Sequence, residues 1–94
     1  MGIPYKVMEM QSKEWYYKWT EGVIVGYLKG TIEEKRALGM LKRAKENIGE
    51  EDLKSLIKAI EISPLYLPYM PKEEKIRKIN ELLRLLKSHK IITT

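Results

Sequence analysis

The chain of 94 residues contains no cysteine, so disulfide bonds and thiolate metal ligands are both excluded. It has one histidine, His89, and without cysteine it offers no nucleophile of the Cys–His type. It also lacks a glycine-rich phosphate loop and the close spacing of ligand residues that a metal site needs. We therefore expect a protein with no catalytic residues, no cofactor and no metal.

Long apolar runs are absent too, since no segment approaches the roughly 18 apolar residues of a membrane-spanning helix. No signal-peptide pattern opens the sequence, which favours a cytoplasmic protein. Side-chain amides are rare, and Gln11, Asn47 and Asn80 are the only ones. Because hyperthermophilic proteins are poor in amides and rich in Lys and Glu, we expect a thermophilic and archaeal source.

Charge, by contrast, is abundant: 18 basic and 13 acidic side chains leave a net charge of +5. This excess favours acidic partners such as nucleic acid. The acidic residues gather where helices are expected to begin, and a helix N-terminus stabilises negative charge. We therefore interpret these acidic clusters as helix-stabilising groups and not as general acids or bases.

The first expected helix runs from Ser12, its N-cap, to about Leu28, and Gly30 stops it. The segment 22–26, with β-branched residues between two glycines, also fits a short buried strand. No second strand is visible to pair with it, so a helix is favoured.

Three more helices follow from the apolar spacing and the breaks. The second begins at Thr31, which with Glu34 forms a capping box, and ends at Gly49. The third covers 50–62, and the last begins at about Pro71.

These elements predict an all-α fold, a small bundle of about four helices in a single domain spanning residues 1–94. A proline-rich connector over 64–71 precedes the last helix, and the tails 1–11 and 91–94 are expected to be loosely held. The centres of the apolar stripes predict the most buried side chains: Leu41, Ile57, Ile60, Ile79 and Leu83.

Basic residues recur seven apart on the second and last helices, away from the apolar stripes. The nucleic-acid-binding candidates are Lys35, Arg36, Lys42, Arg43, Arg77, Arg84 and Lys87. A face built from both helices would suit phosphate contacts without sequence preference. An ordinary solvated surface is the alternative, because pairs such as Glu73 with Arg77 already offset some of the charge. A helix-turn-helix is disfavoured, because its groove-entering helix would be the acidic one at 50–62.

The first helix is apolar on two sides. Trp15, Tyr16, Trp19, Val23 and Tyr27 form the side expected in the core. Tyr17, Ile24 and Leu28 line the other side, and Leu85 likewise lies opposite the main stripe of the last helix. A helix of this kind is either central in its bundle or covered by a partner. We expect Tyr17 and Leu28 to stay exposed in the isolated chain and to bind a partner.

The connector offers Tyr66 and Tyr69 as further partner-binding candidates, docking as an extended segment. Such a segment more often folds back to seal the bundle, and this interpretation is favoured.

The leading hypothesis is a non-catalytic accessory or adaptor subunit that binds a partner protein within a nucleic-acid-handling assembly, such as a replication or transcription polymerase complex. Its composition is similar to that of small basic helical accessory subunits of archaeal replication and transcription machinery, although no motif carries this likeness. The alternatives are direct sequence-independent binding of nucleic acid and a homodimeric helical regulator.

Overall fold

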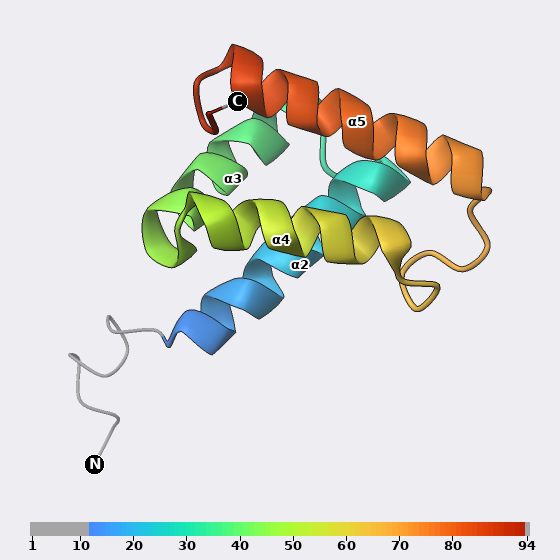
Figure 1. Cartoon of the computed structure of the whole chain (residues 1–94), viewed down its shortest axis with the longest axis horizontal. Helices are drawn as coiled ribbons and strands as arrows, with labels where there is room; N and C mark the ends of the chain where they lie inside the picture. Colours follow the sequence, from blue (N-terminus) through green and yellow to red (C-terminus); the bar gives the residue numbers. More distant parts are fainter. Residues whose placement is uncertain (1–11, 94) are drawn as a thin grey trace.

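The computed structural model describes residues 12–93, which form four helices and no strand (Figure 1). The helices are α2 (Lys13–Lys29), α3 (Glu34–Ile48), α4 (Glu50–Ile62) and α5 (Lys72–Ser88). The predicted all-α bundle is therefore confirmed.

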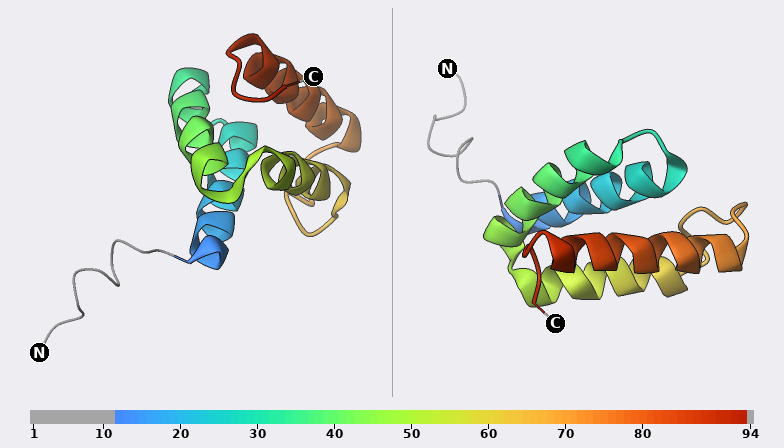
Figure 2. Two further views of the ribbon diagram at one scale, coloured as in Figure 1. Left: turned by 60° about the vertical axis from the view of Figure 1, so that its left-hand side comes forward. Right: turned by 90° about the horizontal axis from the view of Figure 1, so that it is seen from above.

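The helices form two layers, with α2 and α3 in one and α4 and α5 in the other (Figure 2). Short connections join the helices within the α2–α3 pair, which is typical of antiparallel neighbours. Helix α2 packs against all three other helices and is therefore central in the bundle.

The ends of α2 follow the predicted signals. The Ser12 side chain accepts a hydrogen bond from the backbone N–H of Trp15, and Gly30 ends the helix in the left-handed region with φ 85°. The chain then turns so tightly that a Cβ on Gly26 would lie 2.6 Å from the Ile32 side chain. Only glycine fits at this position without moving its neighbour.

The predicted capping box at the start of the second helix is wrong. Helix α3 begins at Glu34, and its N-cap, Glu33, makes no side-chain capping bond. The Thr31 hydroxyl instead donates to the carbonyl of Gly26 at 3.1 Å. The tight turn after α2 takes up Thr31, so this residue is not available as a cap.

Gly49 separates α3 from α4 as predicted, with φ 92°, a conformation that costs other residues strain. Helix α4 has the predicted bounds of 50–62.

Most of the predicted core is correct, because Leu41, Ile57, Ile60 and Ile79 are fully buried. Leu83 is only half-buried, and the prediction for it was wrong. The fully buried positions around it are Ile79, Leu82 and Leu86. Leu83 packs at the edge of the core cluster, because it lies on one side of the buried stripe and about 100° around the helix from Leu82.

The end of the chain also differs from the expected loose tail. After α5, Lys90 has φ 59°, and the backbone N–H groups of Ile91 and Ile92 both donate to the carbonyl of Leu86. Both isoleucine side chains are buried. Residues 91–93 therefore fold back onto the bundle because they carry two large apolar side chains that it can cover. Thr94 and the predicted tail 1–11 lie outside the described residues.

Candidate interaction surfaces

The second apolar side of α2 is part of the core. Ile24 and Leu28 are fully buried, so the prediction that they stay available to a partner is wrong. Tyr17 is half-buried, and its hydroxyl donates to a carboxylate oxygen of Asp52 on α4. This bond, together with burial, raises the pKa of Tyr17 above its ordinary value. The central position of α2 explains the burial, since α4 and α5 cover this side.

The other side of α2, expected in the core, instead reaches the surface at its N-terminal end. Trp15 is 45% exposed, and Tyr16 and Trp19 are half-buried. The Tyr16 ring stands edge-on to Trp15 at 5.0 Å and to Trp19 at 6.1 Å between ring centroids. Val23, further along, is buried as predicted. These aromatic rings form the margin of the core.

Two more of the predicted partner-binding residues lie at the edge of the hydrophobic core. Leu85 is half-buried and packs against the core cluster. Tyr66 is half-buried, and its contact with the Glu21 side chain is the main cause that raises its pKa. Of the six predicted partner-binding residues, Tyr69 alone is well exposed, at 75%.

Two other exposed apolar residues lie close to Tyr69 in the chain: Leu65, which belongs to the proline-rich connector, and Ile62, which the sequence did not single out. Ile62 is 77% and Leu65 is 86% exposed. We call Ile62, Leu65 and Tyr69 the connector surface. The exposure of Ile62 could have been predicted from the sequence, because this residue lies about 200° around α4 from the buried Ile60. The exposure of Leu65 could not, because it depends on the path of the loop.

That loop is held in place by Lys75 of α5. The Lys75 side chain is buried, and its ammonium group donates to the carbonyls of Ser63 and Tyr66, both at 2.8 Å. Leu67 is buried with φ 54°, a conformation that few leucines adopt. The predicted sealing role therefore holds for Leu67, while Leu65 and Tyr69 point to solvent.

The folded connector also encloses a pocket of ≈ 380 Å³. Its lining comes from the end of α4, the loop and the start of α5, and includes Ile62, Tyr66, Met70 and Lys72. The connector surface thus combines projecting apolar side chains with an adjacent hollow that has an apolar edge.

All seven predicted nucleic-acid-binding residues are exposed. Lys35 and Lys42 line a shallow pocket between α3 and the segment after α5. Arg36 and Arg43 lie about 100° further around α3 and are not in this lining. Arg77 lines a different pocket, which also contains Glu33, Glu34 and Glu81. The pocket linings thus place Lys35 beside Lys42 on α3, and Arg77 beside three glutamates.

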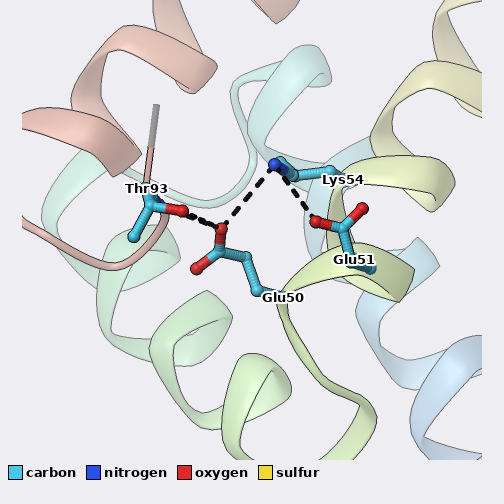
Figure 3. Close-up of polar contacts among 4 residues, drawn as sticks. All are labelled: Glu50, Glu51, Lys54 and Thr93. Carbon is cyan, nitrogen blue, oxygen red and sulfur yellow. Dashed lines mark hydrogen bonds and ion pairs between the residues drawn. The ribbon is translucent and has the colours of Figure 1, made fainter.

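The segment after α5 is held by Glu50 at the start of α4 (Figure 3). The Glu50 carboxylate accepts hydrogen bonds from the backbone N–H of Thr93 at 3.1 Å and from its hydroxyl. Lys54 pairs with Glu50 at 3.6 Å and with Glu51 at 3.5 Å. The bonds from Thr93 lower the pKa of Glu50 below its ordinary value. No sequence signal pointed to this contact, because 43 residues separate its partners.

Within residues 12–93, no group of His, Asp and Glu side chains is arranged to hold a metal ion. Over the same range, no helix has both the length and the apolar character needed to cross a membrane. No protein-family model matches the chain, and neither does any curated protein or solved structure.

Proposed function

We propose that this protein is a non-catalytic accessory or adaptor subunit that binds a partner protein through the connector surface. The observation that carries this proposal is that exposed apolar side chains are concentrated in one short stretch of the chain, residues 62–69. Four large apolar residues are exposed among residues 12–93, and three of them are Ile62, Leu65 and Tyr69. Exposed apolar groups gathered in one place commonly mark an interaction site.

The rigidity of the connector supports the same proposal. Both bonds from Lys75 and the buried Leu67 hold the loop, so Leu65 and Tyr69 project from a fixed backbone. A surface ordered before binding loses less conformational entropy when the partner arrives. Tyrosine is also among the residues that most often dominate binding energy, which makes Tyr69 the expected anchor.

A partner that fits this surface presents an apolar pocket for Leu65 and Tyr69 and a side chain for the hollow beside Ile62. Three side chains bury less than the roughly 800 Å² that each partner contributes to a standard interface, so a polar rim must surround them. A second copy is the competing occupant, because projecting apolar side chains beside a hollow can complement the same surface of another copy. The net charge of +5 supports a nucleic-acid-handling assembly, such as a replication or transcription polymerase complex, as the setting.

The test compares two tagged variants expressed in the native host. One carries Ile62→Ser, Leu65→Ser and Tyr69→Ser, and the other carries Trp15→Ser, which removes an exposed apolar group outside the connector surface. Nuclease-treated extracts are passed over each protein, and the retained proteins are identified by mass spectrometry. We expect a partner that binds wild type and Trp15→Ser, and whose affinity for the triple variant is reduced at least about tenfold.

The triple variant should melt close to wild type, because Ile62, Leu65 and Tyr69 are each at least 75% exposed. Trp15→Ser removes ring contacts with Tyr16 and Trp19 and should melt lower, so binding is compared at a temperature at which both variants are folded. An unchanged set of retained proteins with the triple variant would falsify the proposal. Light scattering at increasing protein concentration tests the homodimer alternative. Self-association that the triple substitution abolishes would mean that the connector surface forms a dimer and is not an adaptor surface for another protein.

A further inference from the structure

One end of the groove between α3 and α5 is lined by basic side chains. Its pocket, of ≈ 300 Å³, has Lys35 and Lys42 of α3 on one wall and His89 with Ile91 on the other. Leu38 and Gly39 complete the lining between the two lysines. All the charged or titratable side chains of this lining are therefore lysine or histidine, and none is a carboxylate.

A second pocket, between the start of α3 and α5, differs in charge. There Arg77 and Lys78 share the lining with Glu33, Glu34 and Glu81, which offset the positive charge. Within the described part of the chain, no carboxylate lies within 4.0 Å of the ammonium group of Lys35 or Lys42. The positive charge of the Lys35–Lys42 end is thus available to an anion from outside.

The spacing and shape of this pocket suit a row of phosphates. Lys35 and Lys42 are two helical turns apart, about 10.5 Å along the axis of α3. Two lysines this far apart can reach different phosphates of one strand. Gly39, halfway between them, has no side chain and leaves room for a ligand to approach the helix.

The opposite wall is fixed in place. His89 and Ile91 belong to the segment that Ile92 and the Glu50–Thr93 contact hold against the bundle. Lys87 and Lys90 are exposed beside this wall and extend the positive charge beyond the pocket. A rigid, open and uniformly basic groove favours an extended polyanion over a single small anion.

We propose that the Lys35–Lys42–His89 groove binds the backbone phosphates of a polynucleotide without reading its sequence. The lysines donate to two phosphates, and an imidazole N–H of His89 adds a third donor. This site is separate from the connector surface, and its failure would leave the proposed adaptor role untouched.

The experiment measures fluorescence anisotropy of labelled 20-base duplex and single-stranded oligonucleotides over a salt series. Lys35→Gln/Lys42→Gln is compared with Arg36→Gln/Arg43→Gln, which removes the same charge from the same helix one residue further on. We expect the lysine variant to bind at least about tenfold more weakly at low salt. Its log–log salt slope on duplex should fall by about 0.9 for each lost phosphate contact. The arginine variant should keep most of the wild-type affinity.

A second variant tests the groove without removing any lysine. Gly39→Glu places a carboxylate between Lys35 and Lys42, where a side chain meets no neighbouring atom. Because glycine is a poor helix former, this change should not weaken the fold, and it should abolish binding.

Three results would overturn the proposal. They are equal losses in the lysine and arginine variants, binding unaffected by Gly39→Glu, and no binding of wild type to either oligonucleotide at low salt. Vesicles containing 30% phosphatidylserine serve as a further arm: lysine-dependent binding to them, without binding to oligonucleotides, would assign the groove to a membrane surface instead.

Discussion

The two non-helical segments that flank α5 share structural features, but one exposes its apolar side chains and the other buries them. The connector before α5 and the segment after it lie at opposite ends of this helix (Figure 1). Each contains one non-glycine residue with positive φ, Leu67 or Lys90. A side-chain hydrogen bond also holds each segment: Lys75 of α5 donates to the Ser63 carbonyl at the start of the connector, and Glu50 of α4 accepts from Thr93. Yet the connector exposes Leu65 and Tyr69, whereas the segment after α5 buries Ile91 and Ile92.

The difference shows that apolar content alone does not decide whether a loop seals a core or displays a surface. After α5, Ile91 and Ile92 both pack into the hydrophobic core cluster. In the connector, Leu67 is the buried apolar side chain. Leu65 and Tyr69 then have no remaining core to cover, and they face solvent.

The largest effect should come from matched truncations in the two segments. Ile92→Ala removes a buried side chain and should lower the free energy of unfolding by about 2–5 kcal/mol. Leu65→Ala, in the exposed connector, should change it by no more than about 0.5 kcal/mol. Urea unfolding followed by tryptophan fluorescence measures both values. Equal losses would mean that the two segments do not differ as described.

A smaller effect is expected from Lys75, which holds the connector. Lys75→Met leaves the carbonyls of Ser63 and Tyr66 without their donor, and should cost about 1–3 kcal/mol. In a domain of this size that corresponds to a fall in melting temperature of roughly 4–8 °C per kcal/mol. Lys72→Met, at an exposed position of the same helix, is the control and should melt like wild type.

Lys75→Met should also weaken partner binding, because it loosens the backbone that carries Leu65 and Tyr69. A variant that melts lower but binds the partner as tightly as wild type would show that connector rigidity is not needed for recognition.

The smallest effect should be the pH dependence of the segment after α5. The pKa of Glu50 is lowered from its ordinary 4.5 in the folded state by its bonds from Thr93. The stabilisation is therefore fully present above pH 4.5 and is lost as the pH falls through the lowered folded-state value. The connector is held differently: backbone carbonyls accept the bonds of Lys75, and the Tyr66 hydroxyl contacts the Glu21 carboxylate.

Hydrogen exchange at the amides of Ile91 and Ile92 measures this loss, because both bond to the Leu86 carbonyl. Their protection should fall at acid pH in wild type, and Thr93→Val should reduce protection at neutral pH and flatten its pH dependence. Protection that is independent of pH in wild type would show that the isoleucines alone hold the segment.

Local sequence signals predicted the helices well, because each depends on residues close in the chain. Ser12, Gly30 and Gly49 mark helix ends through caps and positive φ, and these act wherever the helix is placed. The stripe of α4, with Ile57 and Ile60, predicted its buried face for the same reason. The capping prediction for Thr31 was wrong because its hydroxyl donates to the Gly26 carbonyl in the turn and does not cap α3.

The candidate surfaces were predicted less well, because exposure depends on which helices cover which. Tyr17, Ile24 and Leu28 formed a second apolar stripe that fitted either a partner or a central helix. Only the packing of α4 and α5 against α2 decides for the central helix. Tyr69 was a candidate because of its place in the proline-rich connector, and it is exposed, so its role in binding stays a prediction.

The sequence by itself therefore determined the number of helices, their breaks and most of the residues that each helix buries. These properties follow from the 3.6-residue period and from the backbone preferences of single residues. Only the tertiary structure decided that α2 is central, that Lys35 and Lys42 share a groove with His89 while Arg36 and Arg43 do not, and that Thr93 meets Glu50. Such contacts join residues far apart in the chain, and no local propensity specifies them.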